Sequence, residues 1–233
     1  MAALLLLFGA AAGVLSTVAG LGGGMLLVLA LSAAFDPRAA LAMTTPALLG
    51  ANLHRAWIYR SALDRRVAGI VLVGAFFGAL VGSLVAVALP EAWLPWILLV
   101  VAALAVVREL GWIHWTPSPR ALGPMGFATG TIAASGGMIV SPMLLASGLR
   151  GDALIATASA TAMVIHVGRV LGYGAGGWID TDTLASSALL LVGLLAGNLA
   201  GTRLRAHLGD RVTHGLTYAV LVLVAALALA GVA

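Results

Sequence analysis

The sequence has no cysteine, no lysine and few charged residues of any kind. Charged side chains make up 9% of the 233 residues, hydrophobic side chains make up 62%, and the mean hydropathy is +1.11. The absence of cysteine excludes disulfides, thiolate metal sites and cysteine nucleophiles. A soluble domain of this length needs more polar surface than the chain contains. We therefore expect an all-α integral membrane protein with one membrane domain over residues 1–233 and no metal or other cofactor.

The basic residues are all arginine and stand mostly between apolar segments. They form no continuous patch with interleaved aromatic residues, so we expect no nucleic-acid partner despite a pI near 10.7. Spacing of this kind is typical of the cytoplasmic loops of membrane proteins. No acidic residue lies in the body of an apolar segment, which argues against a carboxylate proton relay and leaves histidine as the only near-neutral coupling group.

Six apolar segments are close to the roughly 20 residues that cross a bilayer. Four further segments, three of them too short to cross, are joined in pairs at the sequences "GLGGG" and "ASGG". A helix of about 12 to 14 residues rises only about 20 Å against a hydrocarbon core of about 30 Å, so each pair is expected to form a broken or re-entrant hairpin. The expected spans are residues 39–59, 67–89, 92–107, 153–173, 183–202 and 212–233, and the shorter segments are 2–19, 24–35, 121–134 and 137–149.

The second half of the chain repeats the first half in the same order. "STVAGLGGGM" faces "TGTIAASGGM", and "HRAWIYRSALD" faces "HVGRVLGYGAGGWID". We infer two repeats, residues 1–110 and 121–233, each with one short-helix pair and three transmembrane helices. The second alignment pairs His54 with His166, Arg55 with Arg169, and Tyr59 with Tyr173.

The positions of the arginines predict that the repeats are inverted. Arginines follow the third segment of repeat one, lie between the repeats, and follow the fourth segment of repeat two. The positive-inside rule places these three loops in the cytoplasm. The turns that contain Glu91 and Asp180 then face the exterior, as do both termini, and corresponding loops fall on opposite sides. We expect two inverted-topology repeats in a multi-pass protein of the cytoplasmic membrane.

Glycine is concentrated at the two joints between the short segments. It lets the chain reverse and lets a ligand approach the backbone, and the helix that follows directs unpaired N–H groups toward an anion. In transporters with inverted repeats the substrate site lies near such breaks. The alternative is close helix packing, which we expect instead for glycines spaced by four, such as Gly74, Gly78 and Gly82. The candidate binding residues at the joints are Gly22, Gly23, Gly24, Ser135, Gly136 and Gly137.

Polar side chains on the third span of each repeat are a second candidate set. Hydroxyl and amide groups there could replace the hydration shell of an anion. The alternative is that they hydrogen-bond the backbone of their own helix, which is common in membranes. These candidates are Thr44, Thr45, Asn52, Thr157, Ser159 and Thr161.

Two pairs of ionisable side chains, His54 with Arg55 and His166 with Arg169, lie in the bodies of spans. Each pair stands toward one end of its span, and the two ends face opposite sides of the membrane. Such positions suit entry or gating residues that attract an anion from either side. The alternative is that the arginines extend to the lipid headgroups.

Other functional classes fit the sequence less well. An intramembrane protease would need a GxSG serine motif, an HExxH motif or paired intramembrane carboxylates, and the sequence has none of these. A structural subunit would not explain the duplicated breaks. A channel, or a permease for another small anion or an organic acid, remains an alternative.

Two pairs of segments are similar to each other and to a known family: "GVLSTVAGLGGGMLLVLAL" with "GFATGTIAASGGMIVSPMLL", and "DPRAALAMTTPALLGANLHR" with "GDALIATASATAMVIHVGR". Through these segments the chain resembles the TauE/SafE sulfite exporter family. The resemblance implies transport of sulfite or an organosulfonate across the cytoplasmic membrane, commonly as export. The second repeat departs from the family pattern, because it reads "ASGGM" and has Pro142 where repeat one has Leu29.

We therefore expect a secondary transporter that exports a small sulfur-containing anion by alternating access around the glycine-rich breaks. Its expected partners are this anion and the lipid bilayer. The oligomeric state is open, and a homo-oligomer is one of the options.

Overall fold

The computed structural model describes residues 1–19, 23–109, 118–132, 137–205, 207–208 and 210–231. These residues form ten α-helices and three short 3-10 turns, and they contain no β-strand. The helices are α1 (Ala2–Ala19), α2 (Gly23–Ala34), α3 (Pro37–Ile58), α4 (Arg65–Ala88), α5 (Leu94–Glu109), α6 (Leu122–Ile132), α7 (Gly137–Ala146), α8 (Gly151–Ala175), α9 (Thr181–Arg205) and α10 (Asp210–Ala230).

Every apolar segment expected from the sequence is a helix, with ends within a few residues of the expected ones. Three helices among the described residues, α4, α8 and α9, are long and apolar enough to cross a membrane by length and composition. Several shorter apolar helices accompany them. The chain is therefore all-helical in the part described, and its long apolar helices are those of a membrane protein.

Aspartates just before three of the helices cap them. The Asp36 carboxylate accepts a hydrogen bond from the Ala39 N–H (2.7 Å), and Pro37 follows it as the first residue of α3. Asp64 accepts bonds from the first N–H groups of α4, and Asp180 accepts one from the Thr183 N–H (2.8 Å) at the start of α9. A side-chain acceptor at this position satisfies N–H groups that have no partner within the helix. Three of the few acidic residues therefore mark the starts of apolar helices.

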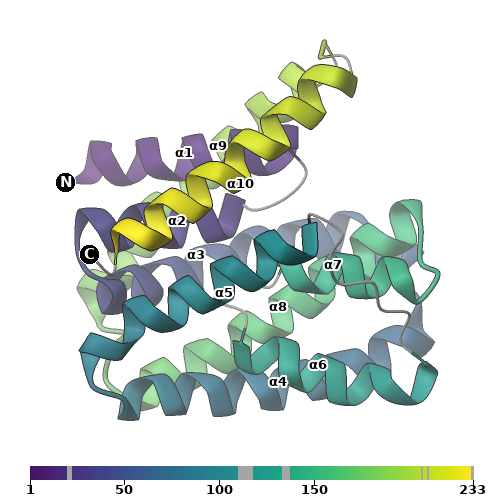
Figure 1. Cartoon of the computed structure of the whole chain (residues 1–233), viewed down its shortest axis with the longest axis horizontal. Coiled ribbons are helices and arrows are strands. Elements are labelled where there is room, and N and C mark those ends of the chain that lie inside the picture. Colours follow the sequence, from purple (N-terminus) through teal and green to yellow (C-terminus); the bar gives the residue numbers. More distant parts are fainter. Residues whose placement is uncertain (20–22, 110–117, 133–136, 206, 209, 232–233) are drawn as a thin grey trace.

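Helices α3 and α8 contact each other along the middle of the molecule (Figure 1). Helix α9 packs on α3 and α4 packs on α8, while α1 packs beside α9 and α6 packs beside α4. The short helices α2 and α7 contact α3 and α8, respectively. Helix α8 is the most enclosed of the three long apolar helices. In its most apolar 18-residue stretch 56% is buried, compared with 28% for α4 and 33% for α9. The polar residues of α8 therefore lie in the interior of the protein.

Glycines spaced by four join the parallel helices α4 and α6. A Cβ atom at Gly74, Gly78 or Gly82 would collide with a carbonyl oxygen of Gly123, Phe127 or Thr131, respectively. In the α1–α9 pair, Gly193 and Gly197 face Gly9 and Ala10 in the same way. Such close approach is how small residues join helices in membranes. The packing interpretation of these spaced glycines is confirmed.

The two short-helix pairs differ in length. Helix α1 has 18 residues and rises about 27 Å, whereas α6 has 11 residues and rises about 17 Å. Figure 1 shows the chain running out along α1 and returning along α2, with α6 and α7 forming a shorter excursion from the opposite end. The first segment of repeat one is thus close to the full thickness of a bilayer core, and its counterpart is about half of it.

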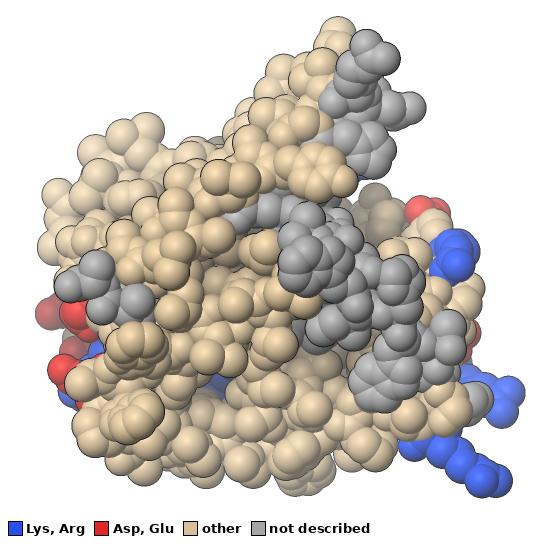
Figure 2. Space-filling model, viewed as in Figure 1, with Lys and Arg blue, Asp and Glu red and all other residues tan. Residues whose placement is uncertain are grey.

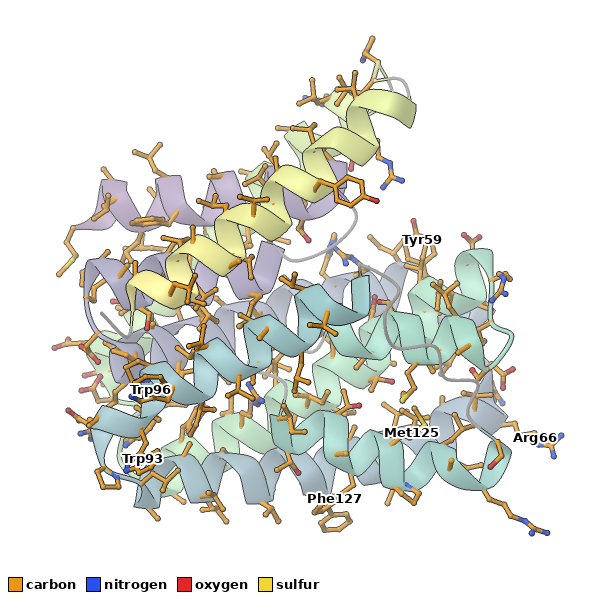
Figure 3. The ribbon with its side chains drawn as sticks, in the orientation of Figure 1. Tyr59, Arg66, Trp93, Trp96, Met125 and Phe127 are labelled. Carbon is orange, nitrogen blue, oxygen red and sulfur yellow. The ribbon has the colours of Figure 1, made fainter. Side chains whose placement is uncertain are left out.

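Charged side chains gather mainly at the two ends of the face in Figure 2, with tan side chains between them. Figure 3 shows Tyr59 and Arg66 at one end and Trp93 and Trp96 at the other. We call the first the arginine end and the second the acidic end. The arginine end carries Arg60, Arg65, Arg66, Arg120, Arg150, Arg203 and Arg205 together with Asp64 and Asp152, and the acidic end carries Asp36, Glu91, Asp180 and Asp182 together with Arg38.

Candidate functional site

The hydroxyl and amide candidates on α3 bond mainly to their own helix. Thr44 donates to the Ala40 carbonyl oxygen (2.6 Å), Thr45 to that of Leu41 (2.7 Å), and the Asn52 amide to that of Leu48 (2.8 Å). Each of these side chains therefore donates a hydrogen bond to the backbone of its own helix, as one of the two alternatives from the sequence predicted. Their oxygen lone pairs remain available to a cation or to a hydrogen-bond donor.

The candidates on α8 are all buried. Thr161 donates to the Thr157 carbonyl oxygen (2.8 Å), and Ser159 is 4% exposed. Thr157 is fully buried, and its hydroxyl has no hydrogen-bond partner among the described residues. Polar groups are expensive to bury without partners. Thr157 therefore carries a buried hydroxyl that is left to bind a ligand in the described part of the chain.

The glycine joints are described only in part. Gly22, Ser135 and Gly136 lie outside the described residues. Gly23 begins α2 and is buried against α1, where a Cβ atom would collide with the Ser16 side chain. Gly24 is half-buried in the first turn of α2, and Gly137 is the first residue of α7.

Arg55 lines a cavity of about 650 Å³ between α1, α3 and α9 at the arginine end. Arg55 is half-buried, whereas its neighbour His54 is exposed, and both line this cavity together with Arg205. Tyr59 lies one helical turn after Arg55 and also lines the wall. The described lining residues include two arginines and no carboxylate, so the lining of this Arg55 cavity is positively charged.

Hydroxyl and amide groups complete the wall of the Arg55 cavity. The Thr17 hydroxyl contacts the side-chain amide of Asn198 (Oγ1 to Oδ1 3.1 Å), and Arg205 Nη1 donates to the Thr17 carbonyl oxygen (3.0 Å). Thr202 donates to the Asn198 carbonyl oxygen (2.9 Å). Sequence reasoning missed these residues as site candidates, although an asparagine inside the apolar segment "GLLAGNLAGT" was a usable signal.

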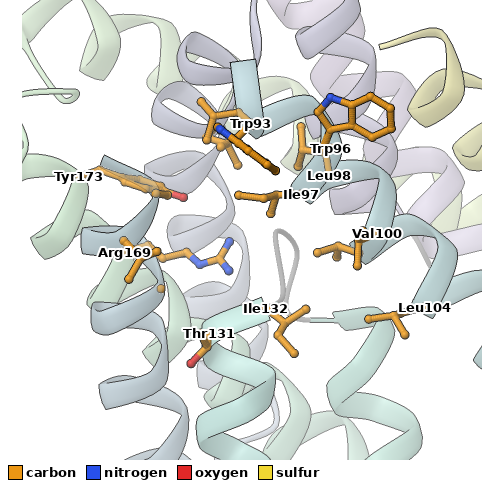
Figure 4. Close-up of a pocket in the computed structure, with 16 residues that line it drawn as sticks. Trp93, Trp96, Ile97, Leu98, Val100, Leu104, Thr131, Ile132, Arg169 and Tyr173 are labelled. Atoms are coloured by element: carbon orange, nitrogen blue, oxygen red, sulfur yellow. The ribbon is translucent and has the colours of Figure 1, made fainter. Parts of the chain in front are cut away.

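Arg169 lines a second cavity, of about 460 Å³, between α4, α5, α6 and α8. Figure 4 shows its guanidinium extending into the cavity, with Tyr173 and Trp93 on one side and Thr131 and Ile132 on the other. Arg169 is 4% exposed, and its Nη2 lies 3.4 Å from the Gly130 carbonyl oxygen of α6. The cavity lies toward the acidic end. The first residues of α5 line it, and Figure 3 shows Trp93 and Trp96, at the start of this helix, at that end. This second site, the Arg169 cavity, is largely apolar apart from its arginine.

The two histidines are not equivalent in the structure. His54 directly precedes Arg55, so their side chains diverge by about 100° around α3, and His54 is exposed. His166 precedes Arg169 by three residues, so the two share a face of α8, and His166 is only 1% exposed. Its Nδ1 has no hydrogen-bond partner among the described residues. Asn52, three residues before Arg55, takes the place on α3 that His166 has on α8.

Each cavity contains an arginine followed four residues later by a tyrosine on the same helix. Arg55 and Tyr59 are on α3, and Arg169 and Tyr173 are on α8. The spacing of four residues puts each tyrosine on the same face of its helix as the arginine. The structure thus places His54 and Arg55 in one cavity and Arg169 in the other, toward opposite ends, whereas His166 lines neither of them. Guanidinium groups can hold an oxyanion through paired N–H donors.

No three His, Asp or Glu side chains among the described residues gather in a way that could hold a metal ion. No curated protein and no solved structure matches the chain. A family model with the description "Sulfite exporter TauE/SafE" matches residues 5–229, nearly the whole chain, and implies membrane transport of sulfite or a similar anion. With its apolar helices and cationic cavities, the protein belongs to the TauE/SafE sulfite exporter family.

Proposed function

We propose that the protein is a secondary transporter that exports a small sulfur-containing anion, sulfite or an organosulfonate, by alternating access. The observation that carries this proposal is the pair of cavities toward opposite ends, each with an arginine and a tyrosine four residues apart. A carrier needs a cationic site that can be reached from either side of the membrane in turn. The Arg55 and Arg169 cavities supply one candidate binding site for each side of the membrane.

Inverted repeats, 1–110 and 121–233, within one membrane domain are supported by the helix contacts. Exchanging each helix with its counterpart five places along the chain turns the α1–α9 pair into α6–α4 and the α3–α9 pair into α8–α4. The α2–α3 pair becomes α7–α8 by the same exchange. All of these pairs are in contact, and α3 and α8 run in opposite directions in Figure 1. This arrangement favours two related states that open toward opposite ends.

The arginine end is assigned to the cytoplasm by the positive-inside rule, which places both termini and the acidic end outside. The charge difference between the ends favours capture of an anion from the cytoplasmic side. Arginines around the Arg55 cavity raise the local concentration of an anion on the cytoplasmic side, and the carboxylates Asp36, Glu91, Asp180 and Asp182 oppose its return on the other. Charge of this kind affects capture rates, whereas the substrate gradient sets the net direction.

The glycine joints are proposed as the pivot and as part of the binding site. The N–H groups at the start of α2 and of α7 have no partner within their helices, and the positive end of each helix dipole favours an anion there. Gly24 and Gly137 stand at these helix starts, and the lack of a side chain on glycine would let a ligand approach the backbone there. His166 and Arg169, on the central helix α8, then complete the route between the two ends.

Sulfite flux into proteoliposomes that contain the purified protein tests the proposal. A carrier gives flux that saturates with sulfite concentration and is accelerated by sulfite on the opposite side, whereas a channel gives no such acceleration. An imposed pH gradient tests whether histidine or the protonation of sulfite contributes to coupling. No sulfite flux above empty liposomes, and no competition by organosulfonates, would contradict the proposed cargo.

A further inference from the structure

The Arg169 cavity differs from the Arg55 cavity in the chemistry of its wall. Apolar side chains of α5 form much of it, among them Ile97, Val100 and Leu104; Trp93 precedes α5, and α4 adds Val85 and Ala86. Arg169 is the one charged side chain among the described lining residues. The Arg55 cavity, in contrast, is lined by two arginines, a histidine and several hydroxyl groups. An ion that binds only through polar groups would leave most of the Arg169 cavity wall without a complementary surface.

The size of the Arg169 cavity also exceeds what a bare oxyanion needs. Its volume of about 460 Å³ falls in the range of pockets that enclose small organic ligands. Sulfite has four heavy atoms and a strongly bound hydration shell, which an apolar wall cannot replace. The cavity therefore suits a ligand that brings apolar surface of its own.

Arg169 fixes where the charged group of such a ligand would lie. Its guanidinium enters the cavity from α8, opposite Ile97 and Val100 of α5 (Figure 4). A guanidinium binds sulfonate oxygens through paired N–H donors, and it does so more strongly where water is excluded. His166, buried one turn earlier on the same face of α8, has a ring nitrogen without a hydrogen-bond partner among the described residues. Within the described lining, Arg169 therefore supplies the positive charge, while the hydroxyls of Thr131 and Tyr173 are further polar groups in the wall.

We propose that the Arg169 cavity binds an amphiphilic organosulfonate, with the sulfonate at Arg169 and the apolar body along α5. This inference rests on the proposed transport function and narrows its substrate class from small sulfur anions in general to organosulfonates with an apolar group. A single small ligand is the occupant, because the cavity volume is that of a small-molecule pocket rather than that of a two-chain lipid.

A homologous series of n-alkanesulfonates, from methanesulfonate to octanesulfonate, tests the inference. Binding to the full-length protein in nanodiscs is measured by titration calorimetry, with empty nanodiscs as the baseline for partition into lipid. Each methylene group that enters an apolar cavity should raise affinity about threefold to fourfold, until the cavity is full. An affinity that is independent of chain length, or sulfite binding as tightly as the longer sulfonates, would overturn the proposal.

A matched pair of variants identifies the cavity as the place of binding. Val100 lines the cavity and is 56% exposed, so V100W should fill part of it without disturbing a packed core and should shorten the chain length at which affinity levels off. Val73 on α4 is similarly exposed, at 60%, but does not line the cavity, so V73W should leave the series unchanged. An identical effect of the two variants would refute this location.

The role of Arg169 is tested separately with R169Q, which should weaken binding of every sulfonate about tenfold or more while preserving the dependence on chain length. Equal loss for R55Q in the same assay would place the sulfonate elsewhere. If an anionic phospholipid displaces the alkanesulfonates, and their affinity rises with length without a plateau, the cavity is a lipid-facing groove and the proposal fails.

Failure of this inference can be distinguished from failure of the proposed function. Saturable sulfite flux together with a flat alkanesulfonate series would retain the transporter and reject the amphiphilic cargo. A length-dependent series, sensitive to V100W, without flux of sulfite or of any alkanesulfonate would retain the binding site and reject transport.

Discussion

The Tyr173 ring stacks on the Trp178 ring, with centroids 5.0 Å apart and ring planes at 17°. Tyr173 belongs to the wall of the Arg169 cavity, and Trp178 belongs to the loop between α8 and α9. The Arg38 guanidinium lies 5.2 Å from the centre of the Trp178 ring, and its Nη1 lies 3.0 Å from Glu91 Oε1. A row of contacts thus leads from the cavity to the turn between α4 and α5.

Trp178→Leu should loosen the acidic end and lower the thermal stability of the protein. The variant loses aromatic stacking and part of a buried side chain, which we expect to cost about 1 to 3 kcal/mol. Thermal unfolding in detergent, followed by circular dichroism, measures the change. Trp57→Leu is the matched control, because Trp57 also lies beneath an arginine, Arg60, but is 65% exposed. Equal destabilisation of both variants would contradict a structural role for the stack.

Gly78→Leu should prevent α4 from packing against α6. The added side chain would meet the Phe127 carbonyl, and relieving this collision by separating the helices should cost at least about 3 kcal/mol. Gly69→Leu, on the same helix, is the control, because a Cβ atom at Gly69 meets nothing within 4 Å. Size-exclusion chromatography and thermal unfolding compare the two. A well-folded Gly78→Leu variant would show that the close approach of these helices is dispensable.

The positions of the helices and the role of the spaced glycines were predictable from the sequence, because segment length, hydropathy and a spacing of four are local properties. The walls of the cavities were not. Thr17 and Asn198 are 181 positions apart and meet only because α1 packs beside α9. The sequence also could not decide between two roles for the threonines of α3. Only the structure shows that Thr44 and Thr45 donate to the backbone of their own helix. The sequence also aligned His54 with His166, whereas burial separates them.

Arg55→Gln should weaken the apparent affinity for sulfite supplied from the arginine end. One charge-assisted interaction in a half-buried site corresponds to roughly a tenfold change in the concentration at half-maximal flux. Arg60→Gln is the control, since it removes the same charge at the same end from an exposed residue that does not line the Arg55 cavity. Raising the salt concentration should reduce any effect of Arg60→Gln more than that of Arg55→Gln. Indistinguishable affinities of the two variants would favour extension of Arg55 to the headgroups.

Gly24→Leu and Gly137→Leu should abolish transport while leaving membrane insertion intact, because a side chain at either position would cover the N–H groups at the start of its helix. Gly23→Leu separates this effect from packing. Gly23 is buried against Ser16, so its substitution should lower thermal stability as well as flux. Flux assays and thermal unfolding on all three variants give the comparison. Normal flux in both Gly24→Leu and Gly137→Leu would remove the joints from the site.

The cap formed by Asp180 should make the start of α9 sensitive to acid. Hydrogen bonds from Thr183, the backbone N–H first, hold the pKa of the Asp180 carboxyl below its ordinary value of 3.8. Because the folded pKa is the lower one, the contribution of the charged cap to stability is present above the ordinary value and is lost as pH falls through the folded value. The thermal stability of the wild type should therefore exceed that of Asp180→Ala at pH 7, and this advantage should shrink as pH is lowered below about 4. Asp180→Asn keeps an uncharged acceptor, so its advantage over Asp180→Ala should not change with pH in this range. The same acid dependence in the asparagine variant would assign the effect to another group.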